Sequence, residues 1–196
     1  MFKHYPIGME IIFSLNLVYI NPMRITGGIY INRKILCPKG IIRPSMDRMR
    51  ESLFAILGDI SGFSFLDLFS GSGIIGIEAA SRGASPIVLV EKDFKKKSAL
   101  IKNISFVDSV ITPVFKPVEL FLNTWKFQFD IIFLDPPFAY NRKEDLIQQI
   151  GKKDALQQGG HIIIHHPSSE ILSEEISKFK LADKRIYGGS TLSFFR

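Results

Sequence analysis

Cysteine is nearly absent from this chain, which contains only Cys37 among its 196 residues. A single thiol excludes an internal disulfide and a zinc site built from several cysteines, and it is typical of a reducing compartment. Charged residues are also sparse, at 22%, whereas hydrophobic residues make up 46%. This balance excludes a disordered chain and indicates a globular one. We therefore expect a folded, cytoplasmic protein.

Long hydrophobic runs are missing as well. The longest extends from Ile11 to Ile20 and is interrupted by Ser14 and Asn16. A helix that crosses a bilayer needs about 20 apolar residues, so we expect no membrane span. No small-residue cleavage site follows this run, and we expect no export signal. Residues 1–22 differ in character from the rest, and we expect them to be a dispensable extension, with the functional chain beginning at Met23.

Acidic residues are scarce in one segment of a chain whose net charge is +6. Between Arg24 and Arg50 there are seven basic residues and a single acid, Asp47, so this stretch carries the whole net charge. A basic arm on a neutral body suits a polyanion, most simply nucleic acid. The alternative is a basic surface that is merely solvated.

Alternating apolar and helical stretches after residue 62 predict a parallel sheet covered on both faces. We expect strands at 63–68, 87–91, 112–115, 129–134, 160–165, 181–187 and 191–195. The expected helices are 74–82, 95–106, 118–122, 143–151 and 169–179. Only Gly188, Gly189 and Ser190 separate the last two strands, which predicts an antiparallel hairpin. The fold class is therefore α/β, with a seven-stranded, mostly parallel sheet of Rossmann-like type.

The segment before this sheet has its own pattern. Strand-like composition around Gly27 and Gly28 predicts a hairpin within 24–36. Apolar residues at helical spacing follow, with Ser45 as the expected N-cap and Gly58 as the stop. We therefore divide the chain into an extension over 1–22, a basic arm with its leading helix over 23–58, and a main domain over 59–196.

A glycine-rich motif follows the first main strand. Gly71 and Gly73 permit a tight turn from strand to helix, and Gly76 lets the helix approach the sheet. With Glu91 at the end of the second strand, the spacing also fits a dinucleotide site, so a nicotinamide enzyme is a rival. However, Asp67 lies at the strand end, where it would repel a diphosphate and attract a sulfonium ligand with its ammonium group.

A second motif, Asp135-Pro136-Pro137-Phe138, directly follows the fourth strand. Two prolines fix the backbone and remove two amide donors, leaving Asp135 and the prolyl carbonyls as rigid acceptors. Ligands of open α/β sheets bind at this edge. Acceptors beside an aromatic ring suit an exocyclic amine on a flat base, with Phe138 stacking on the ring.

Together these motifs look like the S-adenosylmethionine-dependent N-methyltransferases of class I. A closer resemblance is to the RsmD family, bacterial enzymes that methylate the N2 amine of a guanine in 16S ribosomal RNA. It extends over about residues 23–196. The segments that carry it are Met23 to Gly28, Arg43-Pro44-Ser45, Asp47-Arg48, Arg50 to Phe54, Asp67 to Gly73, and Asp135 to Phe138.

Roles follow from the motifs and this resemblance. Asp135, Pro136, Pro137 and Phe138 form the expected catalytic set. The residues expected to bind S-adenosylmethionine are Asp67, Phe69, Ser70, Gly71, Gly73, Glu91 and Val118. The arm residues expected to contact RNA are Arg24, Arg33, Lys34, Arg43 and Arg48. We expect no metal, a monomer, and ribosomal RNA within a small-subunit particle as the partner.

The sequence departs from the family pattern in two places. Lys116-Pro117-Val118 stands where a polar side chain usually meets the adenine, and His165-His166-Pro167 replaces a more acidic segment. We interpret His161, His165 and His166 as structural. The alternatives left open are an amino-methyltransferase acting on DNA or another RNA, a nicotinamide-dependent oxidoreductase, and a non-catalytic RNA-binding assembly factor.

Overall fold

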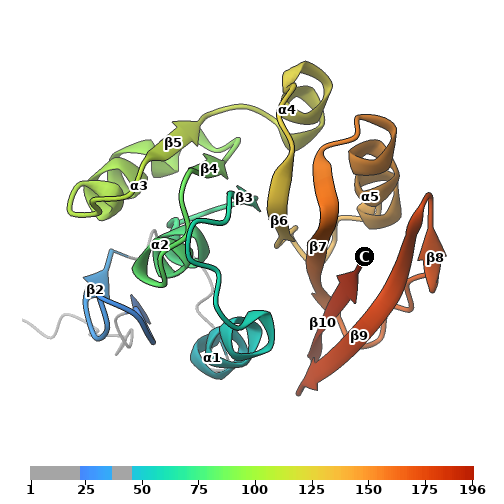
Figure 1. The fold of residues 1–196 in the computed structure, drawn as a ribbon, viewed down its shortest axis with the longest axis horizontal. Coiled ribbons are helices and arrows are strands. Elements are labelled where there is room, and N and C mark those ends of the chain that lie inside the picture. The colour runs from blue at the N-terminus through green and yellow to red at the C-terminus, as the bar shows by residue number, and fades with distance from the viewer. Residues whose placement is uncertain (1–22, 37–45) are drawn as a thin grey trace, which may run out of the picture.

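The computed structural model describes residues 23–36 and 46–196, which form a central sheet with helices on both faces (Figure 1). The strand order is β5-β4-β3-β6-β7-β10-β9-β8. The strands are β3 (Phe65–Leu68), β4 (Ile87–Val90), β5 (Ile111–Val114), β6 (Phe129–Leu134), β7 (Leu156–Pro167), β8 (Glu175–Ile176), β9 (Phe179–Tyr187) and β10 (Ser190–Phe195). The helices are α1 (Met46–Leu57), α2 (Ile74–Ser81), α3 (Lys97–Ile104), α4 (Val118–Thr124) and α5 (Lys143–Lys152), with a short 3₁₀ turn at Phe94–Lys96.

This arrangement confirms the predicted α/β fold. The seven expected strands form the sheet, and two-residue β8 adds an eighth at its edge. Neighbouring strands from β5 to β7 are parallel, whereas β10 pairs antiparallel with both β7 and β9. The predicted C-terminal hairpin is therefore present, and its turn includes Gly188 at φ +58°.

Alternation along each strand divides the core into two layers. Phe65, Ile87 and Leu89 point to the face covered by α1, α2 and α3, whereas Leu66 and Val88 point to the face covered by α4 and α5. Because successive side chains of a strand point to opposite faces, a strand buried on both sides must be apolar throughout. This explains why β4 reads Ile-Val-Leu-Val.

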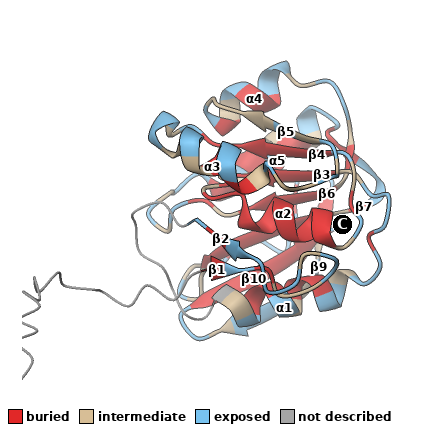
Figure 2. Cartoon of the chain, turned by 90° about the vertical axis from the view of Figure 1, so that its left-hand side faces the viewer, coloured by how far each residue is buried: buried red, intermediate tan, exposed pale blue. Residues whose placement is uncertain are grey.

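Helix α2 lies closest to the sheet, and Figure 2 shows it in red, the colour of buried residues, along its length. Glycine at position 76 makes this approach possible. A Cβ added there would lie 2.2 Å from Cδ2 of Leu89 and 3.3 Å from Cγ2 of Ile87. The predicted role of Gly76 is thus confirmed.

The helix expected over 169–179 is wrong. The spacing of Leu172, Ile176 and Phe179 is helical, yet these residues pack on the α5 face from turns and the short β8–β9 hairpin. Ser177 forms the hairpin turn at φ +59°, a conformation no helix contains. An acid of α5 also holds the loop, because the Ser173 backbone N–H donates to Glu144 Oε1 at 2.7 Å.

The arm segment begins with a hairpin, as predicted: β1 (Met23–Arg24) pairs antiparallel with β2 (Lys34–Ile35). Helix α1 follows and ends at Gly58, where φ is +71° and the backbone N–H donates to the Phe54 carbonyl at 3.1 Å. This confirms Gly58 as the stop, whereas the expected N-cap, Ser45, lies outside the described residues.

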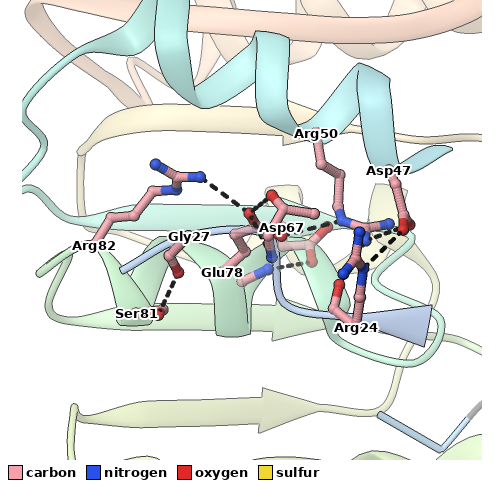
Figure 3. A network of polar contacts seen from close by, with 10 residues as sticks. Arg24, Gly27, Asp47, Arg50, Asp67, Glu78, Ser81 and Arg82 are labelled. Carbon is pink, nitrogen blue, oxygen red and sulfur yellow. Dashed lines mark hydrogen bonds and ion pairs between the residues drawn. The ribbon is translucent and has the colours of Figure 1, made fainter. Parts of the chain in front are cut away.

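A buried ion pair joins the arm to the main domain (Figure 3). Arg50 of α1 and Glu78 of α2 have fully buried side chains, and Arg50 Nε donates to Glu78 Oε2 at 3.1 Å. Arg82 donates to the other oxygen of Glu78 at 3.1 Å, and the backbone N–H of Thr26 donates to it at 3.2 Å. One carboxylate therefore binds the hairpin, α1 and α2 together.

Arg50 extends this network to the rest of the arm. Its Nη2 donates to the Arg24 carbonyl at 2.7 Å and to Asp47 Oδ1 at 2.8 Å. The hairpin turn rests on the end of α2, where the Ser81 hydroxyl donates to the Gly27 carbonyl at 2.6 Å. Arg50, one of the basic residues of the predicted arm, thus serves internal packing.

Replacing Glu78 with alanine should remove the buried partner of the Arg50 guanidinium and leave it paired only with the partly exposed Asp47. We expect the free energy of unfolding to fall by about 3–5 kcal/mol, the usual cost of breaking a buried pair on one side. Urea denaturation measures this loss. Asp145→Ala breaks the exposed Arg142–Asp145 pair and should leave the midpoint nearly unchanged. Equal midpoints for the two variants would contradict the role given to Glu78.

Candidate active site

A cleft of about 400 Å³ opens at the carboxyl edge of β3, β4, β6 and β7, a volume within the range of small-molecule sites. Its lining residues are Phe69, Gly71, Glu91, Lys92, Asp93, Lys96, Asp135, Pro136, Pro137, Phe138 and His165. The two sequence motifs meet here because β3 and β6 are parallel neighbours. A backbone hydrogen bond joins them directly, from the Asp135 N–H to the Leu68 carbonyl at 3.2 Å.

The glycine-rich loop between β3 and α2 has an unusual backbone. Gly71 and Gly73 adopt φ +57° and +80°, and Phe69 has φ +67°, a value that costs energy for a residue with a side chain. The Phe69 ring packs edge-on against Tyr140, with centroids 5.5 Å apart. Ser70 Oγ is buried and has no hydrogen-bond partner among the described residues. Ser70 itself is not among the residues that line the cleft.

Asp67 supports this loop from below and does not line the cleft. Its side chain is buried, and Oδ2 accepts a hydrogen bond from the Gly76 N–H at 3.2 Å. Burial raises the pKa of Asp67 well above its usual range; the Gly76 bond opposes this rise, and the nearby Asp135 and Glu91 charges add to it. The sequence predicted that Asp67 faces the ligand, whereas in the structure its side chain lies under the loop.

Glu91 is already bonded to the chain's own donors. Oε2 accepts from the Gly71 N–H at 2.9 Å and from the Lys96 ammonium at 3.1 Å, while Oε1 accepts from the Asp93 N–H at 2.8 Å. Lys96 is the only one of these donors that belongs to a side chain, and that side chain is 34% exposed. A hydroxyl-bearing ligand at Glu91 would therefore compete first with the Lys96 ammonium.

The second motif is held by residues that sequence reasoning did not connect with it. His165 Nδ1 lies 2.8 Å from Asp135 Oδ1, and the Phe138 ring meets the His165 ring edge-on with centroids 5.5 Å apart. Buried Lys143 donates to the Phe138 carbonyl at 3.2 Å and to the Tyr140 carbonyl, and it pairs with Glu170 at 2.8 Å. The His165-His166-Pro167 departure from the family pattern was the one signal in the sequence.

The remaining predicted residues lie outside the cleft. Val118, the first residue of α4, is buried in the core. Arg24 pairs with Asp47 at 3.6 Å, and the Arg33 guanidinium lies 3.7 Å above the centroid of the Phe106 ring. Lys34 and Arg48 are exposed, and Arg43 lies outside the described residues.

A further residue connects the arm with the loop. The side-chain amide of buried Asn103 donates to the Ser72 carbonyl at 2.9 Å and to the Leu36 carbonyl at 3.0 Å, and its oxygen accepts from the Leu36 N–H. The end of the hairpin is therefore fixed beside the glycine loop, so that α3, loop and arm share one hydrogen-bonded junction.

The charge of the site indicates which ligand it fits. Glu91 and Asp135 line the cleft and Asp67 lies beneath it, close enough that the charges of the first two raise the pKa of the third. Three acids line the cleft, Glu91, Asp93 and Asp135, against two lysines, Lys92 and Lys96. This balance favours a cationic ligand that also bears hydroxyls over a diphosphate. These features fit S-adenosylmethionine better than a dinucleotide.

Within residues 23–36 and 46–196, no group of His, Cys, Asp and Glu side chains is arranged to hold a metal ion. Over the same ranges, no helix has the length and hydropathy needed to cross a membrane.

Comparisons with known proteins agree on one family. The family model described as "Conserved hypothetical protein 95" matches residues 23–196. The "Putative rRNA methyltransferase YlbH" of Bacillus subtilis is 28% identical over 89% of this chain and 98% of its own length. The "Ribosomal RNA small subunit methyltransferase D" of Haemophilus influenzae is 34% identical over 72% of this chain and 77% of its own. Among solved structures, a "Putative methyltransferase yhhF" from Escherichia coli has a TM-score of 0.81 at 30% identity and covers 89% of this chain and 97% of that one.

The buried carboxyl of Asp67 predicts a pH dependence of stability. Its pKa is higher in the folded chain than the value of about 3.9 expected when unfolded. Between the two values the native state holds more protons, so the free energy of unfolding should fall as pH rises through this window. Asp67→Asn should abolish that slope.

Urea denaturation of the wild type and of Asp67→Asn over a pH series, starting near the unfolded pKa of about 4, gives the difference in free energy of unfolding as a function of pH. Asp59 is a control whose effect on the slope of stability against pH has the opposite sign, because hydrogen bonding from the Ser61 hydroxyl lowers the pKa of Asp59. Asp59→Asn should remove a slope by which stability rises with pH. An Asp67→Asn curve parallel to the wild type would refute the assignment.

Proposed function

This chain belongs to the family described as Conserved hypothetical protein 95, the RsmD-like family its motifs resemble, and on that premise we propose its reaction. The protein transfers a methyl group from S-adenosylmethionine to the exocyclic N2 amine of a guanine in 16S ribosomal RNA. The names of its relatives support the RNA class and the small subunit. The observation that carries the choice of an amine is the rigid acceptor set at Asp135, joined to the glycine loop by the hydrogen bond to Leu68.

The acceptors at Asp135 and Pro136 can increase the low nucleophilicity of the guanine amine. The guanine amine is a poor nucleophile because its lone pair is delocalised into the ring. If Asp135 and the Pro136 carbonyl each accept one amine hydrogen, they favour a pyramidal nitrogen whose lone pair points at the methyl group. Phe138 stacks on the base. The carboxylate of Asp135 then accepts the proton that the methylated nitrogen releases.

The other side of the cleft holds the methyl donor. S-adenosylmethionine supplies an electrophilic methyl group, already activated on a positively charged sulfonium. Gly71 and Gly73 let the backbone approach the methionine part, and the Ser70 hydroxyl gains a partner there. Glu91 accepts hydrogen bonds from the ribose hydroxyls in exchange for the Lys96 ammonium. Asp67 contributes indirectly, through the loop that it holds at Gly76, and Val118 borders the adenine through its backbone.

The basic arm is the RNA-binding element in this proposal. Lys34 and Arg48 contact phosphates with exposed side chains, and Arg43 joins them. Arg24 and Arg33 contribute charge while they are bound to Asp47 and Phe106. The substrate is ribosomal RNA within a small-subunit particle. The direct test is mass mapping of modified nucleosides in 16S ribosomal RNA from cells with and without this protein: loss of one N2-methylguanosine supports the proposal, and an unchanged map refutes it.

Asp135 and Glu91 should separate rate from cofactor affinity. Asp135→Ala should abolish methyl transfer while the dissociation constant for S-adenosylmethionine changes by only a few-fold. Glu91→Ala should weaken cofactor binding, because hydrogen bonds to a charged acceptor contribute about 1.5–3 kcal/mol each. Calorimetry and a methyl-incorporation assay measure the two effects. If Asp135→Ala lost cofactor affinity in proportion to rate, or if Glu91→Ala bound cofactor normally, these roles would be wrong.

The arm should give RNA binding a steep dependence on salt. The double variant Lys34→Ala, Arg48→Ala removes two exposed charges. The slope of log affinity against log salt should fall by about 1.4–1.8, because each phosphate contact contributes about 0.7–0.9. Lys152→Ala, Lys153→Ala is the matched control: it removes the same charge at the end of α5, where the chain turns back to the opposite edge of the sheet. An equal fall in both variants would assign the effect to net charge alone.

A further inference from the structure

Two adjacent histidines at the end of β7 have different environments. His166 is a satisfied core residue: Nδ1 donates to the Pro167 carbonyl at 2.9 Å, and Nε2 accepts from the Ser193 hydroxyl at 2.9 Å. Burial lowers the pKa of His166, which favours the neutral ring that these two bonds require. Both of its nitrogens therefore serve the packing of β7 against β10.

His165 is also buried, yet its imidazole is bonded to the acceptor set. Nδ1 lies 2.8 Å from Asp135 Oδ1, and a carboxylate can only accept, so Nδ1 carries the proton and donates it. Nε2 is buried and has no partner in the described part of the chain. Burying a polar nitrogen without a hydrogen bond costs free energy that an apolar residue would avoid. Among the described residues, the hydrogen bond with Asp135 is thus the one that this ring makes.

The strand geometry explains why His165 can act as a fixed support. Leu134 of β6 pairs with Ile164 of β7, and His165 itself pairs with Leu192 of β10. The backbone of His165 is therefore held in the interior of the sheet, whereas Asp135 is the first residue after its strand. Phe138 closes against the edge of the same ring.

We infer that His165 is a positioning residue for methyl transfer, which acts by fixing the carboxylate of Asp135. This inference rests on the proposed function. With Oδ1 occupied by the Nδ1–H of His165, the carboxylate cannot rotate freely, and Oδ2 is left to accept a hydrogen from the guanine amine. The contact with Phe138 aligns the stacking ring with the same support. His165 sets the orientation of the acceptor, so its loss reduces the rate of transfer and leaves cofactor binding intact.

A series of substitutions separates the donated hydrogen bond from the bulk of the ring. In His165→Asn the side-chain amide nitrogen occupies the place of Nδ1, whereas in His165→Gln it occupies the place of Nε2. His165→Leu removes the donor. His161→Asn is the control, because His161 lies on the same strand and outside the residues that line the cleft.

We expect kcat for methylation of small-subunit particles to fall about 10- to 100-fold in His165→Leu and His165→Gln, the range found when a catalytic group is misplaced. His165→Asn should stay within a few-fold of wild type, as should His161→Asn. The KM and dissociation constant for S-adenosylmethionine should be unchanged in all four. If His165→Leu retains the wild-type kcat, or if Asn and Gln fail equally, the inference is wrong. A wild-type protein that methylates no guanine would instead refute the proposed function.

A second measurement needs neither RNA nor cofactor. Nitrogen-15 NMR of the histidine rings should show His165 with its proton on Nδ1, the tautomer that Asp135 selects. In Asp135→Ala that preference should be lost, while the signals of His166 remain as in the wild type. A His165 ring that keeps its tautomer without Asp135, or that carries the proton on Nε2 in the wild type, would overturn the assignment.

Discussion

The adjacency of β3 and β6 is the constraint on which the site depends. These strands are parallel neighbours although 60 residues separate them. The chain builds the sheet outward from β3 in one direction and then returns to continue from β3 in the other. At such a reversal the loops that follow the two strands diverge to opposite faces and leave a crevice at the carboxyl edge. The glycine loop and the Asp135 motif therefore share a cleft, and the hydrogen bond from Asp135 to Leu68 sets their spacing.

Much of this was predictable from local pattern. Apolar runs gave strands such as Phe129–Leu134, and the two motifs, each beginning at a strand end, indicated their common edge. The prediction failed where contacts between distant segments decide the structure. The 169–179 segment has helical spacing, but Leu172, Ile176 and Phe179 pack on the α5 face as turns and a hairpin. The sequence predicted neither the bond of His165 to Asp135 nor the bond of Lys143 to the Phe138 carbonyl, because each joins residues that no local pattern pairs; the unusual His165-His166-Pro167 segment was the only signal.

Charge was the least predictable feature. The excess of basic residues between Arg24 and Arg50 indicated a basic arm that could bind nucleic acid, and Lys34 and Arg48 are exposed. Arg50, however, is among the most buried side chains of the described residues, where it joins α1 to Glu78 of α2. The net charge of a segment does not show which of its arginines are exposed and which are buried in the fold. The described part of the arm and the main domain consequently form one hydrogen-bonded unit.

The Lys96–Glu91 ion pair affects how much free energy a ligand can gain by binding at Glu91. The carboxylate of Glu91 already accepts hydrogen bonds from two backbone amides and an ammonium group. In the proposed site the ribose hydroxyls displace Lys96 or use an acceptor position that is still open, so Glu91 contributes the free energy of its bonds to the hydroxyls, reduced by that of any bond to Lys96 that is lost. The lysine can return to the same oxygen as soon as the hydroxyls leave. In the proposed site Lys96 therefore competes with the bound ligand for one oxygen of Glu91, and this competition opposes retention of the ligand after the reaction.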